Sequence, residues 1–173
     1  MDASISSSSV CTEFLFLAID NIDWFHEDRW FAICFVDGTL KLGKLESAAN
    51  IITYKAHNSY ITSIKWESWG LMYATASFDR TCKIWKEHDD GVVLLHTLKH
   101  NYEPISLEWS PRTGETDTPL LLAVGTSLGT VCVWRLSHKS DVKPQLVSYC
   151  HFFTHHYSNC TLSSGDRRSG SFV

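Results

Sequence analysis

The sequence predicts an all-β fold built from a structural unit that recurs about every 42 residues. Short apolar or alternating runs separated by turn residues dominate the chain, and no window of about twelve residues carries an uninterrupted helical period. Three tryptophans end similar segments at intervals of 42 and 43 residues: Trp24 in NIDW, Trp66 in SIKW and Trp109 in SLEW. Such regular spacing predicts repetition of one supersecondary unit.

Within each unit, strand-like runs flank a tight turn. The runs before and after the turn are Phe31–Val36 and Thr39–Leu42, then Met72–Ser77 and Thr81–Trp85, then Leu120–Val124 and Thr130–Trp134. A unit of this length has room for four short antiparallel strands, which is the size of one β-propeller blade. We therefore divide the chain into a Ser-rich N-terminal tail (1–13), a repeat region (14–156, with units at about 14–56, 57–99 and 100–153) and a polar C-terminal tail (157–173).

Composition excludes several classes of function. The chain has 173 residues, 44% of them hydrophobic and 20% charged, which is typical of a globular domain. The net charge of −4 is dispersed, which argues against nonspecific binding to a nucleic-acid backbone. The longest apolar run, Phe14 to Ile19, is too short for a membrane span, and the first eleven residues lack Lys and Arg, unlike a secretory signal. We expect an intracellular protein, cytoplasmic or nuclear.

The six cysteines form no CxxC pair, and three of them lie in strand-like runs. Free or buried thiols in a reducing compartment are therefore expected. A zinc site is the alternative at the C-terminal end, but the tight ligand pairs of structural zinc are missing. The residues that could bind zinc there are Cys150, His151, His155, His156 and Cys160. We expect neither a metal nor a cofactor.

The middle unit closely resembles a WD40 repeat in four segments: Ala56-His57, Ile61–Trp66, Ala74–Thr81 and Ile84-Trp85. Ala56 stands where the family usually has Gly, and Lys86 follows the terminal Trp in place of Asp. The third unit is a weaker match, and the first has Gly43 where the closing Trp belongs. The resemblance implies blades of a β-propeller. Closed propellers of this family mostly have about seven blades, so about three four-stranded units form an incomplete propeller. We expect a fragment or isoform of a longer protein, or blades supplied by another chain.

By the same resemblance, a structural hydrogen-bond network is expected, in which Asp fixes a His ring, the His contacts a hydroxyl, and the hydroxyl contacts the indole N–H. Thr75 and Ser77 alternate onto one face of the predicted strand, so each is a candidate for the hydroxyl. A Ser-His-Asp catalytic set is the alternative, but nothing in the sequence indicates an exposed nucleophile with an oxyanion site. In the third unit, the positions that match Asp79 and Thr75 are Leu128 and Val124. The network residues are His57, Thr75, Ser77, Asp79 and Trp85.

The predicted function is that of a non-catalytic scaffold that binds other proteins within a multisubunit complex. Aromatic and Arg side chains on turns are the expected anchors for partners, and the resemblance places them at Tyr60, Trp69, Phe78 and Arg80. An enzyme is not expected. The alternative is a subunit of a transcription-associated factor that contacts nucleic acid indirectly or through a limited basic patch. The lysines available for such a patch are Lys41, Lys44, Lys55, Lys65, Lys83 and Lys86.

Overall fold

The computed structural model contains thirteen β-strands and, in the part of the chain that it describes, no helix. The all-β fold class predicted from the sequence is therefore confirmed. In the same part of the chain, no helix is long and apolar enough to span a membrane. The described residues are 19–25, 30–44, 47–88, 91–111, 120–137, 141–152 and 158–162.

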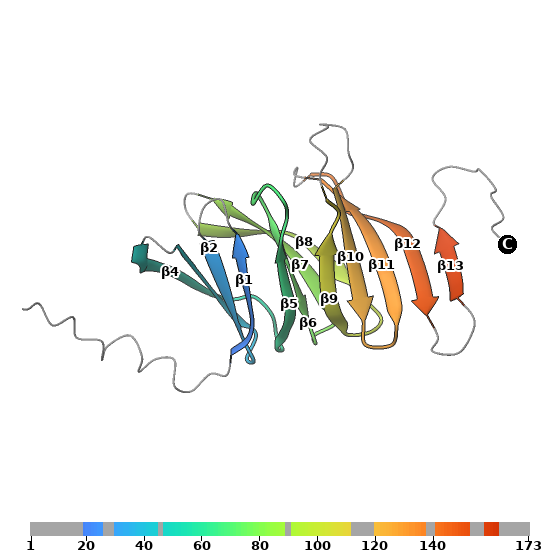
Figure 1. The fold of residues 1–173 in the computed structure, drawn as a ribbon, viewed down its shortest axis with the longest axis horizontal. Coiled ribbons are helices and arrows are strands. Elements are labelled where there is room, and N and C mark those ends of the chain that lie inside the picture. The colour runs from blue at the N-terminus through green and yellow to red at the C-terminus, as the bar shows by residue number, and fades with distance from the viewer. Residues whose placement is uncertain are drawn as a thin grey trace, which may run out of the picture.

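The strands form three antiparallel sheets that follow one another along the chain (Figure 1). Each strand pairs with the next one in sequence, so every sheet is a simple meander. The first sheet comprises β1 (Ile19–Phe25), β2 (Trp30–Phe35), β3 (Thr39–Lys44) and β4 (Ser47–Lys55). The second sheet comprises β5 (Ile61–Trp66), β6 (Tyr73–Ser77), β7 (Thr81–His88) and β8 (Gly91–Lys99). The third sheet comprises β9 (Pro104–Trp109), β10 (Leu120–Thr126), β11 (Thr130–Leu136), β12 (Gln145–Phe152) and β13 (Ser158–Leu162).

The third sheet differs from the predicted four-stranded unit because it has a fifth strand. This strand, β13, lies in segment 157–173, for which the sequence predicts a polar tail. Its sequence, SNCTL, is short and mostly polar, so composition gives little strand signal there. The tails at 1–13 and 163–173 lie outside the described residues.

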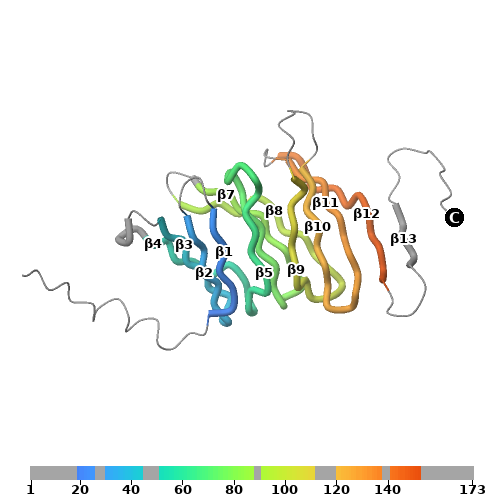
Figure 2. Tube along the Cα trace, viewed as in Figure 1, coloured from blue at the N-terminus to red at the C-terminus, as the bar shows by residue number. Residues whose placement is uncertain are grey.

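The three inner strands β1, β5 and β9 lie side by side, and the sheets form a row that does not close into a ring (Figure 2). Hydrogen bonds link these inner strands directly. The Asn21 Nδ2 of β1 donates to the carbonyl of Thr62 in β5 at 3.3 Å. The Thr62 hydroxyl in turn donates to the carbonyl of Pro104 in β9 at 2.6 Å. Neighbouring sheets are therefore held in a fixed order along the row.

Two hydrophobic cores fill the spaces between neighbouring sheets, so the second sheet is covered on both faces. The core between the first and second sheets contains Ala32, Cys34, Leu40, Leu42, Ala56, Ile61, Ile64, Tyr73 and Trp85. The core between the second and third sheets contains Met72, Ala74, Ala76, Cys82, Ile84, Leu98, Leu107, Trp109, Leu120, Leu122, Val124, Cys132 and Leu136. Within the described residues, each end sheet is covered by a neighbouring sheet on one face only.

The turn between β2 and β3 depends on Gly38, whose φ is +84°. A Cβ at this position would lie 2.4 Å from the carbonyl oxygens of both His57 and Ser59. The Gly38 carbonyl also accepts hydrogen bonds from the amides of Ala56 and His57 at 3.1 and 3.0 Å. Glycine is needed here because the turn of the first sheet meets the backbone that leads into the second sheet.

Candidate functional site

A buried hydrogen-bond network joins the segment before β5 to strands β6 and β7. The Nδ1 of His57 lies 3.0 Å from Asp79 Oδ2, and its Nε2 lies 2.7 Å from the hydroxyl of Thr75. The indole N–H of Trp85 donates to the same Thr75 oxygen at 2.8 Å. His57, Thr75 and Trp85 are all buried, so this one hydroxyl satisfies two side chains that are shielded from water.

Of the two candidate hydroxyls, it is Thr75 that contacts His57. Ser77 is also buried, but its hydroxyl donates to the carbonyl of Ser59 at 3.3 Å and accepts from the amide of Asp79 at 3.1 Å. Ser77 therefore stabilises the turn that presents Asp79. The network and the turn use two different hydroxyls from the same face of β6.

The protonation states follow from burial and from the contacts of Asp79. Burial lowers the pKa of His57 to about 4, and the charge and hydrogen bond of Asp79 offset only part of this shift. Burial alone would raise the pKa of Asp79, but hydrogen bonds from Thr81 and Asn58 and the interaction with His57 outweigh it and lower that pKa. Near pH 7 His57 is thus neutral beside a carboxylate. Its proton then lies on Nδ1, and Nε2 accepts from the hydroxyl of Thr75.

This arrangement fixes strands rather than presenting a nucleophile. Thr75 has no exposed surface, and its oxygen already serves both His57 and Trp85. A nucleophile must reach its substrate, and this hydroxyl does not. The network instead links the segment before β5 to β6 and β7, the two central strands of the second sheet.

The third sheet has a His and a Trp at the positions of His57 and Trp85, but it has other residues at the positions of Thr75 and Asp79. Tyr73 pairs with Trp85 across the strands and Leu122 pairs with Trp134, so Val124 occupies the place of Thr75. The His100 ring lies edge-on to the Trp134 indole, with 5.8 Å between ring centroids. The Nε2 of His100 and the Nε1 of Trp134 are buried, and neither has a hydrogen-bond partner among the described residues. These two atoms correspond to the pair that Thr75 satisfies in the second sheet.

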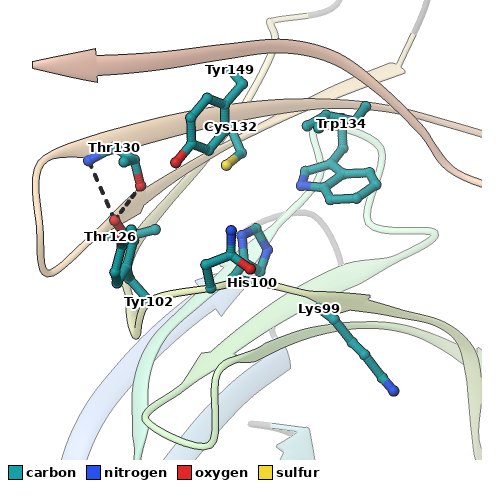
Figure 3. Close-up of a pocket in the computed structure, with 10 residues that line it drawn as sticks. Lys99, His100, Tyr102, Thr126, Thr130, Cys132, Trp134 and Tyr149 are labelled. Carbon is teal, nitrogen blue, oxygen red and sulfur yellow. Dashed lines mark hydrogen bonds between the residues drawn. The ribbon is translucent and has the colours of Figure 1, made fainter.

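A cavity of about 180 Å³ lies beside this incomplete network (Figure 3). His100, Trp134 and Tyr149 line it, together with Thr130, whose hydroxyl is hydrogen-bonded to that of Thr126. The cavity therefore lies where the third sheet lacks the hydroxyl and the carboxylate that complete the network in the second sheet.

The first sheet keeps a different part of the pattern. Asp37 accepts hydrogen bonds from the amide and the hydroxyl of Thr39 at 2.8 and 2.7 Å, as Asp79 does from Thr81. At Gly43, where the closing Trp is missing, a Cβ would lie 2.4 Å from the ring of Phe31. The Phe31 ring thus fills the space beside this position, which explains the absence of a side chain there.

The two buried histidines make stability depend on pH. Burial lowers the pKa of both His57 and His100 from the ordinary value of 6.5 to about 4. Between these values the unfolded chain binds protons that the folded chain does not, so the free energy of unfolding falls as the pH drops from about 6.5 to about 4. Urea unfolding at several pH values should show an uptake approaching two protons, and His100→Gln should remove about one of them. A free energy of unfolding that does not vary over this range would contradict the prediction.

The residues predicted to contact partners fall into two groups. Tyr60 and Phe78 stack with ring centroids 4.7 Å apart, and Arg80 lies in the same turn as Phe78 with a φ of 66°. Trp69 is exposed, but it lies in the loop after β5, whereas Tyr60 lies before β5. A strand of six residues spans roughly 20 Å. The structure therefore brings Tyr60, Phe78 and Arg80 together and leaves Trp69 at the other end of the second sheet.

One residue missed from the sequence, Glu103, belongs beside this aromatic pair. Its carboxylate accepts from Arg80 Nε at 2.8 Å and from the Ser127 hydroxyl at 2.8 Å. The contact joins the turn of the second sheet to the third sheet. Sequence spacing gives no signal for it because the two residues are 23 positions apart in different units. Tyr60, Phe78, Arg80 and Glu103 are called the aromatic turn surface below.

Four of the six lysines of the candidate basic patch contact other groups of the protein. Lys83 donates to the carbonyl of Ala56 at 2.5 Å, and Lys55 lies 3.7 Å from the carboxylate of Asp37. The ammonium groups of Lys41 and Lys44 lie over the rings of Phe35 and Trp30. The structure does not single out a nucleic-acid surface among them.

The prediction of free thiols is wrong at Cys150. Cys34, Cys82 and Cys132 are free and buried, and burial raises their pKa values, that of Cys34 to about 12. Cys150, however, is disulfide-bonded. Pairing of β12 with β13 places Cys150 opposite Cys160 in the backbone ladder, a proximity that ten residues of separation in sequence do not reveal.

No cluster of metal ligands occurs among the residues that the structure describes. Of the side chains considered for zinc, those of His155, His156 and Cys160 lie outside the described part of the chain. The absence of a metal and of a cofactor stays a prediction.

Residues 49–86 match a family model, the WD domain, G-beta repeat, also called WD40. The chain therefore contains a WD40 repeat. This repeat begins in β4 of the first sheet and ends in β7 of the second, so it crosses from one sheet to the next. Because of this offset, a single WD40 repeat connects two neighbouring blades.

Three proteins are similar to this chain, and one of them is named as a WD repeat-containing protein. It is 32% identical over 100 residues to Protein transport protein sec13 of Emericella nidulans, covering 57% of this chain and 31% of that protein. It is 28% identical over 136 residues to Elongator complex protein 2 of Schizosaccharomyces pombe, covering 73% and 17%. It is 41% identical over 68 residues to WD repeat-containing protein WDS homolog of Arabidopsis thaliana, covering 38% and 12%. The chain thus spans less than a third of the length of each of these relatives.

Proposed function

We propose that this chain is a non-catalytic scaffold that binds other proteins as a subunit of a multiprotein complex inside the cell, in the cytoplasm or the nucleus. The WD40 repeat at residues 49–86 supports this role, as does similarity to a protein that is named as a component of the Elongator complex. The burial of Thr75 and His57 supports the absence of catalysis at this network.

The observation that carries the proposal is the aromatic turn surface. Phe78 is 43% exposed although it is a large apolar side chain, and it stacks on Tyr60. The hydrogen bond from Arg80 to Glu103 links the second sheet to the third. This bond restrains the turn that carries the anchor side chains. Aromatic and Arg side chains that are ordered before binding lose little conformational entropy and are enriched among the residues that dominate binding energies.

Affinity purification of the full chain from cells, read by quantitative mass spectrometry, tests this function. Phe78→Ser should reduce recovery of the direct partner about tenfold or more, because an aromatic anchor contributes about 2 kcal/mol to binding. Leu128→Ser is the matched control, since Leu128 is 55% exposed on the turn of another sheet. Equal recovery with Phe78→Ser and wild type, or the absence of any specific partner, would overturn the proposal.

A further inference from the structure

The second sheet holds the carboxylate of Asp79 in a site built from hydrogen-bond donors. Asp79 Oδ2 accepts from the amide of Asn58 at 3.1 Å and from His57 Nδ1 at 3.0 Å. Asp79 Oδ1 accepts from the amide and the hydroxyl of Thr81 at 3.0 and 2.6 Å. Three residues thus supply four hydrogen bonds to one carboxylate.

The third sheet repeats the backbone that surrounds this site. The amide of His100 donates to the carbonyl of Arg80 at 2.9 Å, as the amide of His57 donates to that of Gly38 at 3.0 Å. The turn after the second strand is closed by an equivalent backbone hydrogen bond in each sheet, at 3.2 Å in the second and 3.1 Å in the third. The residues that correspond to His57, Asn58 and Thr81 are therefore His100, Asn101 and Thr130.

Two side chains that fill this site in the second sheet have no equivalent in the third. Leu128 stands at the position of Asp79, and its side chain is 55% exposed. Cys132 stands at the position of Lys83, because each lies two residues before the tryptophan of its strand. The ammonium of Lys83 lies over the Trp85 ring, 5.6 Å from its centroid, a distance that the short side chain of Cys132 does not span.

The cavity of about 180 Å³ lies among these positions (Figure 3). His100, Asn101 and Thr130, the counterparts of the residues that bind the carboxylate in the second sheet, all line it. Lys99, Asn101 and Leu146 in the lining are exposed, so the cavity is open to solvent. Its walls come from β8, from the segment that follows β8, and from β10, β11 and β12. It therefore lies between two sheets inside the row rather than at an end of it.

The lining of the cavity fits an anion that carries an aromatic ring. Among the described residues no Asp or Glu lines it, whereas Lys99 supplies a positive charge. Burial lowers the pKa of His100 to about 4, so near pH 7 the ring is neutral and can donate from Nδ1, as His57 does. Trp134 and Tyr149 contribute aromatic surface. A cavity of roughly 150 Å³ is large enough to bind benzene.

We propose that this cavity binds a small aromatic carboxylate, whose carboxylate group takes the place that the Asp79 side chain occupies in the second sheet. One of its oxygens accepts from the Asn101 amide and from His100 Nδ1, as Asp79 Oδ2 does from their counterparts. The other oxygen faces the hydroxyl of Thr130, which at present is hydrogen-bonded to that of Thr126. Hydrogen bonds to an ionised acceptor are about twice as strong as those between neutral groups, so the site selects the ionised form.

Titration of the full chain with benzoate, followed by ¹⁵N NMR, tests the site. Benzoate should shift the signals of the Trp134 indole N–H and the Asn101 amide with a Kd of about 1 mM, an affinity within reach of a ligand this small. Benzamide has the same shape without the charge and should bind about tenfold more weakly or worse. A blocked Gly-Asp-Gly peptide carries the carboxylate without the ring and should also bind more weakly than benzoate.

Substitutions in the third sheet locate the binding. Leu128→Asp supplies the missing carboxylate from the chain itself, so it should weaken benzoate binding about tenfold or more. Leu128→Ala is the matched control and should bind benzoate as wild type does, because the Leu128 side chain is exposed. Cys132→Leu adds bulk inside the cavity without adding a charge and should also weaken binding. Circular dichroism verifies folding, and Cys132→Leu replaces Leu128→Asp if the latter is unfolded.

Several results would overturn the proposal. These are the absence of any shift with benzoate, equal binding of benzoate and benzamide, tighter binding of the peptide than of benzoate, and unchanged benzoate binding in a folded Leu128→Asp variant. The cavity is separate from the aromatic stack that carries the proposed scaffold function, so Phe78→Ser should bind benzoate as wild type does. Either proposal can therefore fail while the other stands.

Discussion

Replacing Thr75 by valine is expected to lower the free energy of unfolding by about 3 kcal/mol and the melting temperature by roughly 10 °C. The change preserves shape but leaves His57 Nε2 and Trp85 Nε1 buried without their shared partner. Each buried polar group without a hydrogen bond costs about 1–3 kcal/mol. Urea unfolding followed by tryptophan fluorescence, together with a thermal melt, measures the loss.

Thr97→Val is the matched control for this substitution. Thr97 lies on β8 with its side chain exposed, so removing its hydroxyl leaves no buried group without a partner. Its effect should lie within about 0.5 kcal/mol of wild type. If Thr75→Val proves no more harmful than Thr97→Val, the network does not stabilise the second sheet.

The opposite change in the third sheet, Val124→Thr, is expected to raise the free energy of unfolding by about 1–2 kcal/mol. Its hydroxyl would lie between His100 Nε2 and Trp134 Nε1, which at present lack partners among the described residues. Leu128 replaces the acidic residue here, so no carboxylate fixes the His100 tautomer, and the ring can present Nε2 as an acceptor. The NMR signal of the Trp134 indole N–H should shift downfield when this hydrogen bond forms.

Val93→Thr is the control, because it adds the same hydroxyl at an exposed position on β8 and should change stability by about 0.5 kcal/mol or less. A Val124→Thr variant that is less stable than wild type would show that His100 Nε2 and Trp134 Nε1 do not gain a hydrogen-bond partner from a hydroxyl at this position. Because the two substitutions are opposite changes at equivalent positions, their effects should have opposite signs.

The spacing of Trp24, Trp66 and Trp109 is sufficient to predict three sheets, because each repeat places its tryptophan at the same point of its inner strand. The identity of the network hydroxyl could not be predicted in this way. Alternation puts Thr75 and Ser77 on one face of β6, and only the approach of the His57 ring from the preceding segment distinguishes them. A pattern along one strand carries no information about which residue a neighbouring segment meets.

Three further features depend on contacts between segments. Trp69 and Phe78 are both exposed aromatic residues in turns and therefore look like equivalent partner anchors in the sequence. Trp69 follows β5, however, whereas Phe78 follows the antiparallel strand β6, so the two lie at opposite ends of the second sheet. Arg80 meets Glu103 only because the second and third sheets are adjacent. Cys150 is disulfide-bonded and lies in β12, which pairs with β13. The polar sequence of β13 does not predict this pairing.

A row of sheets that does not close also has consequences for folding cooperativity. The second sheet is supported from both sides, whereas within the described residues each end sheet is supported by one neighbour. In stacked repeats, stability is approximately the sum of unit and interface contributions, so opening begins at the ends. Partial unfolding should therefore proceed inward toward His57 and Trp85, and an end sheet can open while the central network stays intact. Ring closure would remove both starting points at once.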